Sequence, residues 1–200
     1  HNDLDGGTFV YEAGGQRWAM DMGSDDYQLK NYFTQSLKYR YGYYRKSTAG
    51  HNTLTFNNDL ADNDNRGACD QDPGMTGRTE ITLFAGSDTG ASPGASESDA
   101  AMSASSSPAY SIVDLTAAYN PQNSSSIERG FAFSKSYEHL FIADEFTFAP
   151  SSAVENVTWS MHTAATIKLG GGVAHQGGNA SGDSGVPGSA VLLLGGVSLY

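Results

Sequence analysis

Short runs of apolar, β-branched and aromatic residues alternate along the chain with clusters of Gly, Ser, Asn and Asp, and helical periodicity is almost absent. This pattern is typical of an antiparallel β-sandwich, so we expect an all-β fold. A short helix is expected only within 27–40, and the stretches 86–107 and 170–189, rich in Gly, Ser and Ala, are expected to be mobile loops. Strands are predicted at 8–13, 16–22, 51–57, 78–85, 109–119, 128–135, 139–148, 154–168 and 190–199.

The first two strands have a predicted register, because Gly14-Gly15 can form a two-residue hairpin turn that pairs Ala13 with Gln16. Counting back from the turn separates an apolar face from a polar one. The apolar face carries Tyr11 opposite Trp18 and Phe9 opposite Met20, and the polar face carries Glu12 opposite Arg17 and Thr8 opposite Asp21.

The strand at 51–57 shows the same alternation of apolar and polar positions. Leu54 and Phe56 share one parity and His51 has the other. Because side chains alternate between the two faces of a strand, we expect Leu54 and Phe56 to face the interior and His51 to point away from the apolar layer.

Length and charge limit the classes of function. Two hundred residues suit one domain, and the chain starts inside a motif and stops inside an apolar run, so we interpret 1–200 as one β-sandwich domain of a longer protein. No apolar stretch approaches the roughly 20 residues that a membrane-spanning helix needs. With 11 basic against 22 acidic residues the net charge is −11, which argues against nucleic acid as a partner.

Three residues form a candidate metal site. Asp3, Asp21 and His51 offer two carboxylates and one imidazole, a donor set that suits Zn, Mn or, less well, Ca. Asp5 would lie outside the ligands or compete with Asp3. The spacing alone leaves an alternative open, in which the aspartates form turns and His51 is a surface histidine.

The segment 39–46 concentrates tyrosines and basic residues in an otherwise acidic chain. Tyr43 and Tyr44 could stack on sugar rings, and Arg45 could bind a carboxylate or sulfate through two hydrogen bonds. The alternative is an edge strand whose basic residues prevent aggregation while its tyrosines pack in the core.

Three blocks of the sequence resemble, in order and spacing, the opening of the C-terminal β-domain of the heparinase II/III-like polysaccharide lyases. The blocks are His1 to Phe9, Trp18 to Gly23 and His51 to Leu54. The resemblance implies that His1 is catalytic and that Asp3, Asp21 and His51 hold a divalent metal. Asp3 stands where a histidine can stand in the family, and Arg45 resembles an arginine that precedes the third block in relatives.

The resemblance implies a parent enzyme that cleaves an acidic, uronate-containing polysaccharide by β-elimination, in the periplasm or after secretion. The imidazole of His1 would transfer a proton, and further acid and base groups would lie on an N-terminal helical toroid domain of the same chain. Trp159 and His162 resemble a structural strand of these lyases, so we assign them to packing. Two alternatives remain, which are a non-catalytic carbohydrate-binding β-sandwich module and a purely structural sandwich.

Overall fold

The computed structural model describes residues 3–34, 37–57, 71, 78–85, 109–119, 124–134, 139–169, 174–175 and 190–199. Every sheet in this part is antiparallel where its register is given, and its helices span three or four residues, so the predicted all-β class is confirmed. None of these helices is long and apolar enough to cross a membrane. The chain divides into two compact units, residues 1–55 with 158–200 and residues 56–157.

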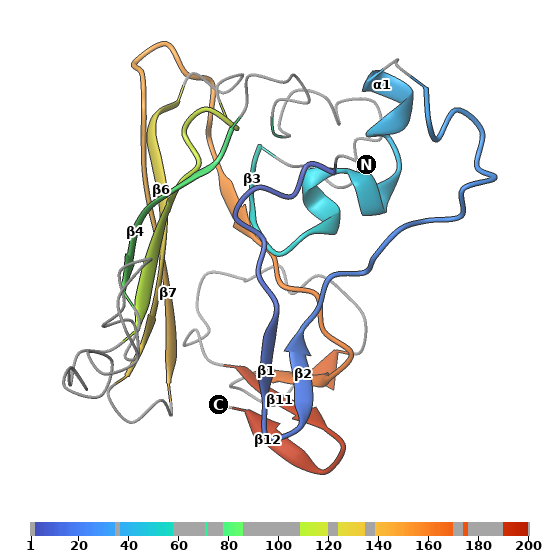
Figure 1. Ribbon diagram of the computed structural model, residues 1–200, viewed down its shortest axis with the longest axis vertical. Coiled ribbons are helices and arrows are strands. Elements are labelled where there is room, and N and C mark those ends of the chain that lie inside the picture. Colours follow the sequence, from blue (N-terminus) through green and yellow to red (C-terminus); the bar gives the residue numbers. More distant parts are fainter. Residues whose placement is uncertain are drawn as a thin grey trace, which may run out of the picture. The chain divides into compact units, whose positions relative to one another are not determined.

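Among its described residues, the first unit has a hairpin, a four-stranded sheet and three short helices (Figure 1). The hairpin is β1 (Tyr11–Ala13) with β2 (Gln16–Ala19). The four-stranded sheet has the order β10 (Ala174–His175), β9 (Thr166–Leu169), β11 (Ala190–Leu194) and β12 (Val197–Leu199). The helices are α1 (Leu37–Arg40), η1 (Tyr44–Lys46) and η2 (Thr48–Gly50).

The second unit is built around one four-stranded sheet, whose long strands run side by side in Figure 1. Its order is β4 (Glu80–Ala85), β5 (Tyr110–Asp114), β6 (Ser124–Phe133) and β7 (Leu140–Phe148). The chain passes between the units at β3 (Leu54–Phe56) and β8 (Val157–Trp159), which pair with each other. Most of the predicted loops 86–107 and 170–189 lie outside the described residues.

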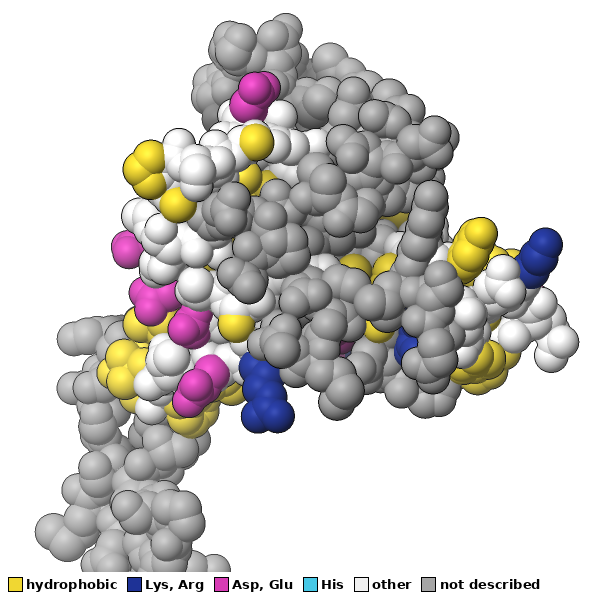
Figure 2. All heavy atoms as spheres, turned by 90° about the horizontal axis from the view of Figure 1, so that it is seen from above, with side chains coloured by type: hydrophobic (Ala, Val, Ile, Leu, Met, Phe, Trp, Pro, Cys, Tyr) yellow, Lys and Arg dark blue, Asp and Glu magenta, His cyan; other side chains and the backbone are white. Residues whose placement is uncertain are grey.

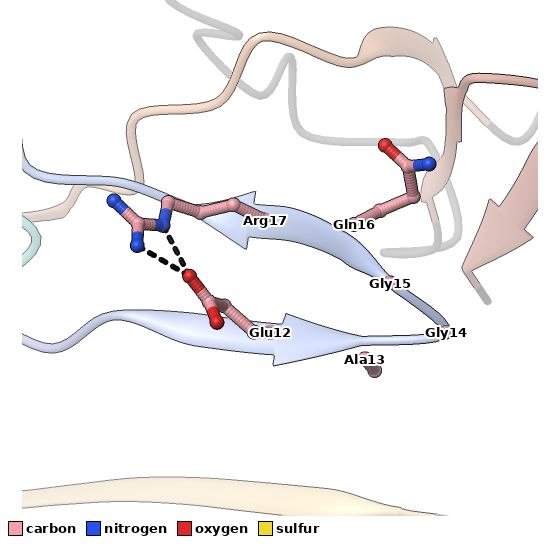
Figure 3. A pocket seen from close by; sticks show the side chains of 6 residues that line it. All are labelled: Glu12, Ala13, Gly14, Gly15, Gln16 and Arg17. Carbon is pink, nitrogen blue, oxygen red and sulfur yellow. Dashed lines mark hydrogen bonds and ion pairs between the residues drawn. The ribbon is translucent and has the colours of Figure 1, made fainter.

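The predicted hairpin register is right next to the turn and wrong beyond it. Ala13 pairs with Gln16 and Glu12 with Arg17, and the two guanidinium–carboxylate contacts of the latter pair are drawn in Figure 3. A bulge then shifts the register, so that Tyr11 lies opposite Ala19 instead of Trp18. The hollow in Figure 3 is lined by residues 12–17 and contains none of the predicted site residues.

The bulge leaves Trp18 in the core of the first unit. The indole is 1% exposed, its Nε1–H donates to the Ala13 carbonyl at 2.9 Å, and it packs with Ala165 and Leu192. Tyr11 lies against the same cluster, so the prediction that Tyr11 and Trp18 face one interior is confirmed. The buried indole therefore has its one hydrogen-bond donor satisfied.

The third predicted strand is shorter than expected and buried on both sides. Leu54 and Phe56 face the interior as predicted, at 2% and 0% exposed, but His51 is also buried, at 3%. The ring of His51 meets the Asp21 carboxylate, in line with the expectation that it points away from the apolar layer, but it is buried, so the alternative of a surface histidine is wrong. The polar side chains of this segment can be buried because they are hydrogen-bonded. The Thr53 hydroxyl, for example, donates to the Gly6 carbonyl at 2.8 Å.

The second unit carries a buried ion pair between β6 and β7. Arg129 is 0% exposed and lies opposite Asp144 in the ladder. Its Nε and Nη2 donate to the two carboxylate oxygens at 2.7 and 3.1 Å, which is a bidentate arrangement. The next pair in the register places Glu128 opposite Glu145, and both of these side chains are exposed.

Candidate functional site

Two of the predicted metal ligands lie in direct contact. The Nδ1 atom of His51 is 2.9 Å from Oδ2 of Asp21, which follows β2. The other carboxylate oxygen of Asp21 accepts a hydrogen bond from the Gly23 N–H at 2.7 Å, in a turn where Gly23 has a φ of +68°. Burial opposes ionisation of Asp21, but the Gly23 and His51 contacts outweigh it and lower the pKa of the carboxyl.

The remaining nitrogen of His51 is the unusual atom of this site. A carboxylate can only accept a hydrogen bond, so the contact with Asp21 places a proton on Nδ1. The Nε2 atom is buried and has no hydrogen-bond partner in the described part of the chain. Buried polar atoms are rarely left unpaired, so Nε2 is suited to receive a ligand or a proton. A histidine that donates to a carboxylate through one nitrogen and binds a ligand through the other is the usual arrangement at metal sites.

Asp3 is paired with a buried cation rather than with His51. Its Oδ1 atom lies 2.5 Å from Nζ of Lys46, a residue of η1 that is 2% exposed. The ammonium also lies 4.7 Å from the centre of the Tyr32 ring. Burial opposes the charge on Lys46, but Asp3 and Tyr32 outweigh it and raise the pKa of the amine.

A third carboxylate lies near these groups. Burial raises the pKa of Asp5, although the residue as a whole stays solvent-accessible. The negative charges of Asp3 and Asp21 also raise this pKa, whereas His51 lowers it. No three His, Cys, Asp or Glu side chains of the described ranges are already grouped to hold a metal ion. The chemistry of the donors, carboxylate oxygens beside an imidazole, is of a kind that divalent cations accept.

A second imidazole stands beside the first, at a position that sequence reasoning assigned to packing. His162 accepts a hydrogen bond at Nε2 from the Tyr44 hydroxyl at 2.9 Å, and its Nδ1 lies 3.0 Å from Oδ1 of Asn52. Asn52 is 0% exposed. In the sequence, Asn52 could have indicated the contact with His162. It directly follows the candidate ligand His51, and an amide at such a position needs polar partners when it is buried.

The short helices η1 and η2 carry or flank the residues that contact Asp21 and His162. Tyr44 begins η1, and His51 and Asn52 follow directly after η2. Gly50 makes this approach possible, because a Cβ atom at that position would overlap the carbonyl of Tyr44. Beyond Gly50 the backbone is extended at His51, whose side chain contacts Asp21, while the next side chain, Asn52, contacts His162.

The predicted substrate-binding residues Tyr43 and Arg45 both donate hydrogen bonds to backbone carbonyls of the first unit. The Tyr43 hydroxyl donates to the Lys30 carbonyl at 2.5 Å. Nη1 of Arg45 donates to the carbonyls of Met22 and Ser24, at 2.9 and 3.2 Å, which fixes the segment after Asp21. Tyr44, the third residue of this group, is 45% exposed. The predicted catalytic residue, His1, lies outside the described residues.

The comparisons with known proteins bear on this site. The family model described as "Heparinase II/III-like, C-terminal" matches residues 1–187, a range that includes all the site residues described in this subsection. The chain belongs to the heparinase II/III-like family. No curated protein and no solved structure matches the chain. This is a polysaccharide lyase family, so the recognition made from the three sequence blocks is confirmed, and the chain carries the C-terminal domain of such a protein.

Figure 2 shows the charge distribution over one face. Acidic side chains appear at several places among apolar ones, and the Lys and Arg side chains coloured there stand apart from one another. This agrees with a net charge of −11. Near the site, Lys46 is engaged by Asp3 and Arg45 by the backbone carbonyls of Met22 and Ser24.

Proposed function

We propose that this chain is the β-domain of a lyase that cleaves an acidic, uronate-containing polysaccharide by β-elimination. The observation that carries the proposal is the family match over a site in which a buried imidazole nitrogen of His51 has no partner in the described part of the chain. An N-terminal helical domain of the same protein would complete the substrate cleft. A polymeric substrate of this kind would support a periplasmic or secreted enzyme.

The reaction requires two proton transfers. A base takes the proton from C5 of the uronate, the electron pair forms a C4–C5 double bond, the C4–O4 bond breaks, and an acid protonates O4. The C5 proton becomes acidic only when the neighbouring carboxylate is neutralised. In this proposal His1 is one of the proton-transfer groups.

The test of the proposal is ultraviolet absorbance of the unsaturated product. The full-length protein is incubated with a panel of uronate polymers that includes glycosaminoglycans and alginate. Absorbance that grows with time on one of them is expected. Binding to such a polymer without any absorbance would instead favour the second candidate, a carbohydrate-binding module, which the half-exposed Tyr44 beside Arg45 supports.

A divalent metal, with zinc as the first choice and manganese or calcium as alternatives, is proposed at His51, Asp21 and Asp3. When bound it would supply positive charge that holds the site and acts on the substrate carboxylate. For an ion bound at Nε2 of His51, Asp21 can become a ligand only by leaving Nδ1 of the same ring, and Asp3 only by leaving Lys46. Lys46 would then stay close as a second cation.

We predict that zinc raises the melting temperature of the protein and that His51→Gln abolishes this increase. An ion that binds only the folded state stabilises it by RT ln(1 + [L]/Kd), so a concentration of about 100 Kd contributes about 2.7 kcal/mol. Thermal unfolding is measured with zinc, with manganese, with calcium and with a chelator. The matched control is His139→Gln, at an exposed histidine that stacks on Phe141 in the second unit. An equal zinc response in the His51 and His139 variants would contradict the assignment.

We predict that Arg45→Ala mainly raises KM for the polymer, by about 10-fold or more, because a guanidinium that binds a carboxylate or sulfate acts in the ground state as well. The substitution also removes the hydrogen bonds to Met22 and Ser24. Arg45→Lys keeps the charge but cannot form a bidentate contact, so it separates the two roles. Steady-state kinetics on wild type and both variants are the measurement, and an unchanged KM in Arg45→Ala would exclude substrate binding.

A further inference from the structure

The link between Tyr44, His162 and Asn52 is a polar feature of the first unit that the proposed function does not use. It starts in the core, where the Asn52 amide nitrogen donates to the carbonyls of Phe9 and Met20 at 2.7 and 3.1 Å. These two contacts fix the orientation of the amide, because a carbonyl can only accept. Oδ1 of Asn52 therefore points at His162.

The orientation of Asn52 determines which nitrogen of His162 carries the proton. Oδ1 is an acceptor, so Nδ1 of His162 must be the donor across the 3.0 Å contact. In the neutral ring Nε2 is then a lone pair, and it accepts the hydroxyl proton of Tyr44 at 2.9 Å. Burial lowers the pKa of His162, and the charge of His51 acts in the same direction, which favours this neutral form.

The outer end of the link is accessible to a substrate. The Tyr44 side chain is 45% exposed, so a substrate can reach it. An exposed tyrosine does not need a protein partner for its hydroxyl, yet this hydroxyl is hydrogen-bonded to the half-buried His162. Because the hydroxyl proton points toward His162, the oxygen lone pairs are left to accept from another group. Burial also raises the pKa of Tyr44, so the hydroxyl keeps its proton at neutral pH and needs a neighbour that takes it during a transfer.

We propose that Tyr44 is a catalytic proton acceptor and that His162, positioned by Asn52, takes the proton of Tyr44 in the same step. The inference rests on the proposed lyase function. The C5–H bond breaks and its proton goes to the Tyr44 oxygen, while the hydroxyl proton moves to Nε2 of His162. The electron pair of C5–H forms the C4–C5 double bond, the C4–O4 bond breaks, and O4 takes a proton from the imidazolium of His1.

Two groups offset part of the cost of charging His162 in this step. Nδ1–H continues to donate to the fixed Asn52 oxygen, and the carboxylate of Asp21 favours the protonated ring. The phenol oxygen thus transfers a proton without becoming a free phenolate. A histidine in this role is a relay, because it touches Tyr44 and not the substrate.

The test uses full-length protein with Tyr44→Phe and His162→Gln, assayed by ultraviolet absorbance. Tyr44→Phe is expected to lower kcat about 100-fold with little change in KM, since a proton-transfer group acts in the transition state. His162→Gln can still accept the hydroxyl hydrogen bond but cannot take up the proton, so kcat is expected to fall about 10-fold. Tyr27→Phe, at a tyrosine 50% exposed in the same unit, is the matched control.

Two further readouts separate catalysis from structure. With substrate deuterated at C5, Tyr44→Phe is expected to show a larger isotope effect on kcat/KM than wild type, because proton removal becomes slower. If Tyr44→Phe is unstable, fluorotyrosine at position 44 keeps the ring and the hydrogen bond but lowers the phenol pKa, so a changed rate supports the relay. An unchanged rate overturns it.

The outcomes distinguish the two proposals. Wild-type product formation together with full kcat in Tyr44→Phe, or with an equal loss in Tyr27→Phe, overturns the relay and leaves the lyase intact. The absence of unsaturated product from wild type on every uronate polymer overturns the lyase and the relay with it. Product from wild type, with a selective loss of kcat in the Tyr44 and His162 variants, supports both.

Discussion

Replacing His1 with alanine in the full-length protein is expected to lower the rate of unsaturated product formation by about 100- to 10,000-fold, the range typical of one acid or base group. A proton-transfer residue contributes to the reaction barrier and little to the core, so the melting temperature is expected to change little. Initial rates by ultraviolet absorbance and thermal unfolding on the same preparations are the two measurements.

The matched control for His1→Ala is His139→Ala, which removes an exposed imidazole from the second unit. It is expected to keep wild-type activity. Full activity in the His1 variant would exclude this residue from proton transfer. Equal losses in the two variants would indicate a general effect of losing a histidine rather than a catalytic role.

Turn chemistry in the sequence predicted one hairpin and could have predicted another. Gly14-Gly15 was used to set the register of β1 and β2, and both glycines have positive φ as a two-residue turn requires. Gly195-Gly196 has the same conformation and joins Leu194 to Val197. The prediction of one continuous strand at 190–199 overlooked this signal and is wrong.

Other features of the fold depend on contacts that local patterns do not contain. The alternation at 51–57 indicated a strand with one polar face, but whether that face is exposed depends on what covers it. Segments distant in sequence provide hydrogen bonds there, as the Thr8 hydroxyl does for the Asn52 N–H at 3.1 Å. Burial of His51 follows from this tertiary packing.

In the candidate site, too, some contacts were predictable from the sequence and others depend on tertiary packing. Family-like blocks predicted that Asp21 and His51 belong together, and the structure places them in contact. The pairing of Asp3 with Lys46 spans 43 positions of sequence, and no spacing rule relates the two residues. The predicted strand 154–168 also breaks between β8 and β9, and this irregular segment contains His162, whose N–H donates to Asn52 at 2.6 Å.

Asp144→Ala is expected to destabilise the second unit by about 3–5 kcal/mol, because it leaves Arg129 charged and buried without its bidentate partner. Both Trp18 and Trp159 belong to the first unit, so tryptophan fluorescence does not report on this loss. Amide hydrogen exchange of β6 and β7, measured by mass spectrometry, gives the stability of the affected strands directly.

The neighbouring pair in the ladder supplies the control for Asp144→Ala. Glu145→Ala removes an exposed carboxylate that lies opposite Glu128, so it relieves a like-charge contact and should change stability by less than about 0.5 kcal/mol. The double variant Arg129→Met with Asp144→Leu is expected to recover most of the loss, because apolar side chains of similar size can replace a buried ion pair. Exchange in Asp144→Ala as slow as in Glu145→Ala would show that Arg129 does not depend on Asp144, and the ion pair would then lose its assigned role.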